Sequence, residues 1–377
     1  MKHYPAYIKD NWLKKTFPLK PLDEHIHAAA QWLMHAQSQA ADGGVPHCFD
    51  VKKKRWWPSY PETTGYIIPT LFDYGNEYKV ASAIEAAIRM TQWESDIQLE
   101  DGGVMAGHMG AEVITPTIFN TGQVLFGWAR AYEETHEQSF YESLRRASDW
   151  LVEAMDEDGA WRKYASPFAP GEVKVYNTRC AFGLARSYQV IGDHKYLEAA
   201  IKNIDWALTM AKPNGWLIKN CLTLNPQSLT HTIAYAMRGI LEVGAFTENQ
   251  NFIDFAIQMA QKMMVLQRDD GAFPGRVDEH WTSKHQWTCV TGNSQLAINF
   301  FRLFEITGNK EFLFSAVGAN RFNRSIQDTE TENSNIFGAM KGSHPINAEY
   351  ISYRYPNWAA KFFIDALLLE KKLANSQ

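Results

Sequence analysis

The chain has 377 residues, a formal net charge of −5 and 45% hydrophobic residues, a composition typical of globular proteins. The negative charge argues against nucleic acid as a general partner, and no apolar run reaches the ~18 residues of a membrane span. The start of the chain has neither an apolar core segment nor a small-residue cleavage site, so we expect no signal peptide and a cytoplasmic protein. The four cysteines are far apart and form no Cys-x-x-Cys pair, which predicts free thiols and no zinc site.

Twelve segments with helical periodicity follow one another along the chain, and they are of two kinds that alternate strictly. One kind follows a short polar turn and carries a single apolar stripe, which is typical of outer helices that are wet on one side. These outer segments are 24–39, 79–96, 138–156, 195–211, 250–267 and 310–327. The other kind is apolar on more sides and richer in small residues, as suits an inner ring. These inner segments are 62–75, 115–135, 176–192, 229–245, 288–308 and 355–372.

Six outer and six inner segments in alternation predict an all-α fold, the (α/α)6 toroid. We expect residues 23–377 to form this single toroid domain, preceded by an N-terminal extension at 1–22. No stretch alternates with period two for long enough to predict a large sheet.

A repeated Asp-Gly step marks the end of the outer segments. It occurs at Asp42, Asp101, Asp158 and Asp270, and Asn214-Gly215 fills the gap in the series. The spacing of about 57 residues indicates one repeated supersecondary unit. We interpret the step as structural, with Asp capping a turn that Gly allows, and not as a catalytic acid.

Long connections follow these turns and lead into the inner segments, so all six should emerge on one face of the ring, which we call the mouth. Loops of more than ~12 residues in a compact domain are usually functional. Twelve Lys and Arg but only six Asp and Glu lie in the mouth, although the whole chain is acidic. This charge favours an anionic ligand, unless the Lys and Arg of 52–55 form only a solvated loop tip. The mouth segments are 43–61, 102–114, 159–175, 215–228, 271–287 and 338–354.

The mouth is also rich in Trp, with six of the 13 in the chain. Flat rings beside polar groups suit the faces of sugars. Trp161 and Trp216 are better interpreted as plugs between helix pairs. The candidate substrate-binding residues are Arg55, Trp56, Trp57, Tyr60, Arg162, Arg179, Trp281, Trp287 and Arg354.

Acid–base chemistry needs carboxylates, His or Tyr at the mouth, and glycosidic hydrolysis needs two carboxyl groups. Glu62 starts an inner segment, where it could instead complement the helix dipole. His231 also opens an inner segment, and a core His is an equal alternative. The candidate catalytic residues are Glu62, Glu112, His231, Glu349 and Tyr350.

Motifs that would indicate a cofactor or a metal are missing from the sequence. The chain has no His-Glu-x-x-His pattern, so we expect no metal. It has no Gly-rich phosphate loop, dinucleotide fingerprint or Gly-x-Ser-x-Gly elbow, so we expect no cofactor and no serine-hydrolase chemistry.

The turns at 98–104, 155–161 and 267–273 resemble the Gln-x-x-Asp-Gly-x-Trp motif of terpenoid cyclases and prenyltransferases, which is structural in that family. The acidic Asp-x-Asp-Asp motif of the cyclases is absent. The chain is similar in style to sugar-active toroids, namely unsaturated glucuronyl hydrolases and the helical domain of glucuronyl 5-epimerases. Tyr-Pro-Glu-Thr-Thr at 60–64 resembles a Tyr-Pro-Thr-Thr stretch of the epimerases.

These resemblances imply a carbohydrate-active enzyme whose partner is an acidic, uronate-containing oligo- or polysaccharide. Glycosidic cleavage by mouth carboxylates is the first expectation. A uronate 5-epimerase or a polysaccharide lyase, each working by proton abstraction, is the alternative. A terpenoid-cyclase-like protein or a saccharide-binding protein without activity is the further alternative.

Overall fold

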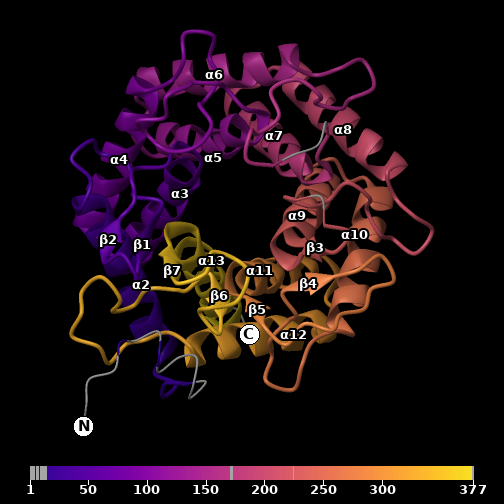
Figure 1. Cartoon of the computed structure of the whole chain (residues 1–377). Coiled ribbons are helices and arrows are strands. Elements are labelled where there is room, and N and C mark those ends of the chain that lie inside the picture. Colours follow the sequence, from indigo (N-terminus) through magenta and orange to yellow (C-terminus); the bar gives the residue numbers. More distant parts are fainter. Residues whose placement is uncertain (1–4, 6–7, 9–14, 170–172, 224, 376–377) are drawn as a thin grey trace.

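The described part of the chain forms two concentric rings of helices (Figure 1). In this computed structural model, residues 5, 8, 15–169, 173–223 and 225–375 are described. The inner helices are α3 (Pro61–Tyr78), α5 (Ile118–Thr135), α7 (Thr178–Ile191), α9 (Thr230–Phe246), α11 (Val290–Thr307) and α13 (Asn357–Asn375). The outer helices are α2 (Leu22–Ser38), α4 (Ala81–Asp96), α6 (Gln138–Glu153), α8 (His194–Thr209), α10 (Gln250–Met264) and α12 (Lys310–Ser325). The predicted (α/α)6 toroid is confirmed, and every helix end lies within three residues of its predicted position.

The inner helices contact one another in sequence order around the ring, and α13 closes it by contacting both α3 and α2. Their apolar faces fuse into one core that runs around the whole ring. In the described part of the chain, no helix is both long and apolar enough to cross a membrane.

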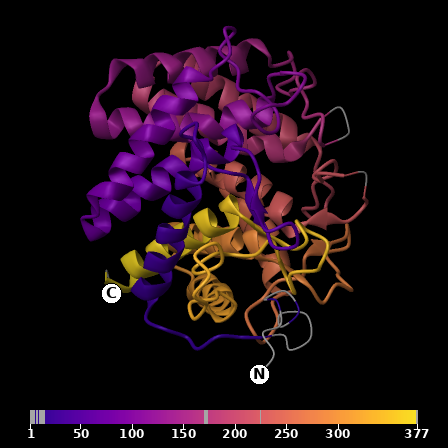
Figure 2. The ribbon, with the colours of Figure 1, turned by 60° about the vertical axis from the view of Figure 1, so that its left-hand side comes forward.

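The long loops gather on one side of the ring, as the turned view in Figure 2 shows. Short antiparallel strands, which the sequence did not predict, join these loops in pairs. The first loop carries β1 (Cys48–Asp50) and β2 (Arg55–Trp56), and β1 also pairs with β7 (Arg354–Pro356) of the last loop. The other pairs are β3 (Ser228–Leu229) with β4 (Arg276–Val277) and β5 (Thr288–Cys289) with β6 (Ser343–His344). Neighbouring loops are therefore tied together at the mouth.

The repeated Asp-Gly step forms the same turn each time. In all five, the Oδ1 atom of Asp or Asn accepts a hydrogen bond of 2.9–3.2 Å from the backbone N–H two residues later. The following Gly has a φ between +81° and +98°, a conformation that L side chains rarely adopt. The step is structural, as the sequence analysis predicted.

The turn glycines also lie against the next outer helix around the ring. A Cβ added to Gly271 would come within 2.0 Å of the carbonyl oxygen of Gly318 in α12. A sixth turn, which the sequence analysis missed, places Gly338 in the same way against α2, where its Cβ would lie 2.2 Å from the Ala28 oxygen. The backbone N–H of Gly338 donates to the Asp328 oxygen at 2.9 Å, with nine residues between them where the equivalent bond from Gly271 to Arg268 spans two. This turn closes the outer ring.

A glutamine before the turn links neighbouring outer helices. The Nε2 atom of Gln98 donates to the oxygens of Gly102, in its own turn, and Ser143, in α6, at 2.9 and 3.0 Å. Gln267 makes the equivalent pair of hydrogen bonds at 3.0 and 2.9 Å. The Gln-x-x-Asp-Gly pattern therefore has the structural role that its resemblance to the cyclase motif implied.

Candidate active site

A cavity of about 220 Å³ lies at the mouth, where the inner helices begin. The first turns of the inner helices and the loops before α3, α7 and α13 supply its polar lining. Its lining includes His47, Tyr60, Glu62, Tyr66, Asn120, Tyr176, His231, Tyr235, Tyr350 and Trp358. This mixture of hydroxyls, imidazoles and aromatic faces is suited to a small polar ligand with flat apolar sides.

Two inner helices each aim a pair of side chains into the cavity. Glu62 and Tyr66 are four residues apart on α3, and His231 and Tyr235 are four residues apart on α9. Residues at this spacing lie on one face of a helix, one above the other. The first turn of each helix therefore supplies a titratable group, and the second turn supplies a phenol below it.

Glu62 carries the only carboxyl group among the described residues that line the cavity. Burial raises the pKa of Glu62 to about 7, although the Tyr60 hydroxyl, which donates to Oε2 at 2.9 Å, acts to lower it. A carboxyl group with a pKa near neutrality can both accept and return a proton at physiological pH.

His231 is held in a defined tautomer. Its Nδ1 lies 2.8 Å from Oε1 of Gln295, an oxygen that can only accept, so Nδ1 carries the proton and Nε2 is an acceptor. Burial lowers the pKa of His231 to about 4, so the ring is neutral at pH 7. The ring centroid of His231 lies 4.4 Å from that of Tyr235 and 5.3 Å from that of Tyr350.

Replacing Tyr60 with Phe should raise the pKa of Glu62 further. The variant loses the hydroxyl that donates to the ionised carboxylate, and burial, which favours the neutral acid, then acts alone. The pH dependence of kcat/KM measures this shift as an upward move of the apparent pKa. Tyr66→Phe is the matched control, because Tyr66 lines the same cavity and keeps the Tyr60–Glu62 hydrogen bond intact. Equal profiles for the two variants would contradict the assignment.

An aromatic cluster forms one wall of the cavity. The ring of His47 lies 4.7 Å from that of His108 and 4.6 Å from that of Trp358. Burial and the neighbouring Arg354 lower the pKa of both histidines. Beyond His108 and Trp57 lies a side groove of about 710 Å³, so the mouth has room for a ligand longer than one unit.

The structure brings some of the predicted site residues together at the cavity and the side groove. Glu62, His231, Tyr350 and Tyr60 line the cavity, whereas Arg55, Trp56 and Trp57 line the side groove. Four of these seven residues come from the first mouth loop, and Phe168 lines both the cavity and the side groove.

Three other predicted residues lie away from the cavity wall. Glu112 is exposed. Glu349 is 47% exposed and accepts a hydrogen bond of 2.8 Å from the Nε atom of Arg276. Arg354 lies 4.6 Å above the Trp57 ring, beside the side groove.

The remaining predicted residues make contacts elsewhere. Arg162 forms ion pairs of 2.9 and 2.7 Å with the acidic residues of its own turn. Trp281 is only 7% exposed, donates to the Asn214 oxygen at 3.1 Å and packs against the buried Trp216, with 5.2 Å between the ring centroids. It therefore fills the interior beside Trp216 and does not line the cavity. Trp287 packs on Gly275 outside the cavity. Arg179 is buried in the ring, below the cavity.

The sequence analysis missed several cavity residues. Tyr66 and Tyr235 lie within inner helices, where aromatic residues look like core. The four-residue spacing from Glu62 and from His231 was the signal that could have found them. Tyr176 and Trp358 carry no comparable signal. Across the described ranges, no cluster of three His, Cys, Asp or Glu residues could hold a metal ion.

Comparisons with known proteins show the fold. No known protein family and no curated protein matches the sequence. Among solved structures, an unsaturated glucuronyl hydrolase specific for heparin has a TM-score of 0.76 and 15% identity over 94% of this chain and 98% of its own. A D-mannose isomerase has a TM-score of 0.72 and 13% identity over 98% and 100%. Cellobiose 2-epimerase from Bacillus thermoamylovorans has a TM-score of 0.69 and 12% identity over 87% and 92%. The predicted resemblance to sugar-active toroids is thus confirmed at the level of fold.

Proposed function

We propose that the protein is a carbohydrate-active enzyme that moves a proton between the carbon atoms of a reducing sugar, as an aldose–ketose isomerase does. The observation that carries the proposal is Glu62, the one carboxyl group among the described residues of the cavity wall, with a pKa of about 7. An isomerisation requires one such group, because the carboxyl that removes a proton from the carbon next to a carbonyl can return it to the neighbouring carbon.

The other cavity side chains suit the same chemistry. In the proposed reaction, Glu62 takes the proton from carbon 2 of the open-chain sugar, and the electrons of the C–H bond move to the carbonyl oxygen. Burial keeps the phenols of Tyr66 and Tyr350 protonated by raising their pKa, so they can donate to that oxygen. His231, neutral and with Nε2 as an acceptor, can take the proton of the adjacent hydroxyl. The fold likeness to a D-mannose isomerase and a cellobiose 2-epimerase adds an analogy.

Glycosidic cleavage of a uronate saccharide, the first expectation from the sequence, is the second candidate. The raised pKa of Glu62 also suits a general acid, and a glucuronyl hydrolase has the same fold. The usual mechanism needs a second carboxyl group. Among the described residues of the cavity wall there is neither a second carboxylate nor a Lys or Arg for a uronate. Arg55 lines the side groove and Arg354 lies beside it, so both could meet an anionic saccharide there.

Turnover in deuterated water separates the two candidates. D-mannose, cellobiose and an unsaturated glucuronyl disaccharide are each incubated with the protein, and the products are followed by proton NMR. We expect loss of the carbon 2 proton signal of a reducing sugar through exchange with solvent. Release of a free uronate with no exchange at carbon would instead favour glycosidic cleavage. Binding of a sugar without either change would contradict both enzyme proposals.

A further inference from the structure

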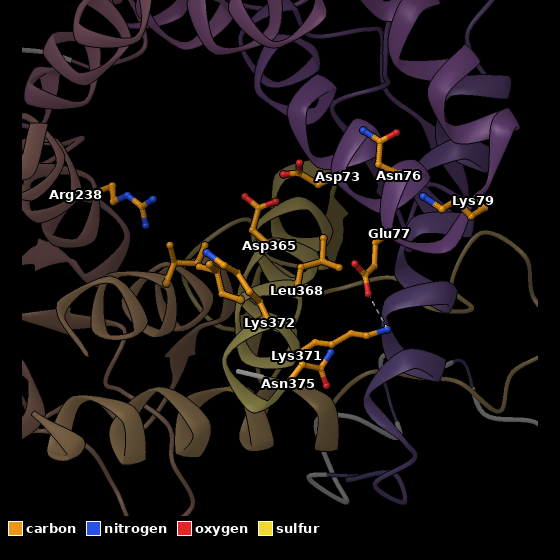
Figure 3. Close-up of a pocket in the computed structure, with 12 residues that line it drawn as sticks. Asp73, Asn76, Glu77, Lys79, Arg238, Asp365, Leu368, Lys371, Lys372 and Asn375 are labelled. Atoms are coloured by element: carbon orange, nitrogen blue, oxygen red, sulfur yellow. Dashed lines mark ion pairs between the residues drawn. The ribbon is translucent and has the colours of Figure 1, made fainter. Parts of the chain in front are cut away.

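A second space lies within the ring, on the side away from the mouth. It is a pocket of about 70 Å³ between α7, α9, α11 and α13, which we call the inner pocket. It shares Arg238, Ile298 and Asp365 with a larger hollow of about 830 Å³ that opens on the face opposite the mouth. Figure 3 shows Arg238 pointing into this hollow, across from Asp365 and Asp73. Tyr235 lines both the inner pocket and the cavity and so stands between them. A ligand would therefore enter the inner pocket from the hollow on the opposite face.

Arg179 brings a buried positive charge to the inner pocket. It is 7% exposed, and its guanidinium carbon lies 4.2 Å from the ring centroid of Phe126 and 5.1 Å from that of Phe182. Its Nε atom is buried and has no hydrogen-bond acceptor among the described residues. Aromatic faces stabilise a cation, but they do not replace a hydrogen-bonded counterion. A buried guanidinium of this kind is costly unless an anion pairs with it.

The acidic residues around the inner pocket already have other partners. Asp365 binds the Lys361 ammonium and accepts a hydrogen bond of 2.6 Å from the Thr70 hydroxyl. Glu242 accepts two hydrogen bonds from Arg302, at 2.9 and 3.2 Å. Neither carboxylate lies within ion-pair distance of Arg179. Both attract its positive charge only over a longer distance.

A second guanidinium faces the same position. Arg238 lies 5.9 Å from the ring centroid of Phe182, the ring that Arg179 also contacts. Arg238 shares the carboxylate of Glu242 with Arg302 and so is only partly neutralised. Its buried Nη1 atom has no acceptor among the described residues. Gln295 and Asn299 add neutral amides to the wall. Two arginines with unused donors at one small polar space match the oxygens of a tetrahedral anion.

We propose that the inner pocket binds a phosphate group between Arg179 and Arg238, either as free inorganic phosphate or as the phosphoryl end of a small metabolite. The free space of about 70 Å³ is enough for a small oxyanion. The hollow beyond Arg238 accommodates the rest of a phosphate ester. The site is separate from the candidate active site and does not depend on the proposed reaction.

Isothermal titration of the full chain with inorganic phosphate, and separately with glycerol 3-phosphate, tests this site. We expect saturable binding that is not reproduced by sodium chloride at matched ionic strength. Tighter binding of glycerol 3-phosphate would identify a phosphate ester as the ligand, and tighter binding of inorganic phosphate would identify the free ion. No saturable binding of either anion, or an equal response to chloride, would overturn the proposal.

The variant Arg179→Gln locates the binding in the chain. It should weaken phosphate binding on the order of 10- to 100-fold, because charge-assisted hydrogen bonds are lost. In phosphate-free buffer the variant should unfold at a temperature no lower than the wild type, since an uncompensated buried charge is removed. Arg186→Gln is the matched control and should leave phosphate affinity unchanged, because Arg186 is half-buried on the same helix and already pairs with Glu133. Unaltered phosphate affinity in Arg179→Gln would overturn the assignment to the inner pocket.

Discussion

Replacing Glu62 with Gln is expected to lower kcat by about 10²- to 10⁴-fold, the usual contribution of a general acid–base group. Gln keeps the shape of the protonated acid and can still accept the hydrogen bond from Tyr60, but it cannot carry a proton to or from a substrate. Turnover of the sugar identified in deuterated water gives the measurement, and exchange at carbon should be lost together with product formation.

Glu112→Gln is the matched control for Glu62→Gln. Glu112 also lies at the mouth, but it is exposed and does not line the cavity. We expect its replacement to leave kcat within about twofold, as usual for a surface residue away from the site. A Glu62→Gln variant with near-normal turnover would remove Glu62 from the mechanism, whichever sugar is the substrate.

The stability of the Glu62→Gln variant should differ from that of the wild type in its pH dependence. The folded protein raises the pKa of Glu62 from 4.5 to about 7, so the folded state binds this proton more tightly than the unfolded state. The contribution of Glu62 to the free energy of unfolding is therefore greatest below pH 4.5 and is lost as the pH rises to about 7. The Gln variant has no such proton to lose, so its free energy of unfolding should fall less than that of the wild type between pH 5 and pH 8. Unfolding in urea at the two pH values measures this difference.

Replacing Gly271 with Ala should destabilise the ring by about 2–5 kcal/mol, from a left-handed backbone together with overpacking. Gly271 has a φ of +92°, and a Cβ would lie 2.0 Å from the Gly318 oxygen of the neighbouring outer helix. Either the turn or α12 must therefore move. Urea unfolding followed by circular dichroism measures the loss in the free energy of unfolding.

Gly308→Ala separates the two causes. Gly308 ends α11 with a φ of +69°, but an added Cβ there has no atom within 4 Å. We expect a loss of only about 1–2 kcal/mol, from the backbone conformation alone. If both variants lost the same stability, the contact between the turn and the next outer helix would contribute nothing to the ring.

The helices could be predicted because their apolar periodicity and their alternation are local properties of the sequence. One helix start was misplaced, because a proline can either begin a helix or lie in the loop before it. The sequence predicted a helix over 115–135, a range whose second residue is Pro116, and proline suits a first helical turn. In the structure, Pro116 instead pairs with Met105 in an isolated bridge, and α5 begins at Ile118. The sixth turn was missed because an insertion separates Asp328 from Gly338, so no Asp-Gly pair marks it.

The candidate site was harder to predict, because it forms where residues distant in the sequence meet. Glu62 and His231 could be chosen because each opens an inner segment. The sequence gives no measure of the distance from Arg162 to a turn aspartate, and in the structure local ion pairs hold this side chain away from the cavity. Trp281 and Trp57 look alike as loop tryptophans, yet one is buried against a turn and the other lines the side groove. Contacts between loops decide whether a loop tryptophan is buried or lines the groove, and the sequence does not show these contacts.

Because α2 contacts α13, the first and last helices of the ring are neighbours, and the chain could begin at another point of the ring. Asp23, in the first turn of α2, forms an ion pair of 3.0 Å with Lys371, in the last part of α13, although 348 positions separate them. The two ends of the ring therefore lie beside each other and could be joined by a short linker, while the tight turn at Gly192 between α7 and α8 could be opened. Such a circular permutant would keep every helix pair and every mouth loop intact.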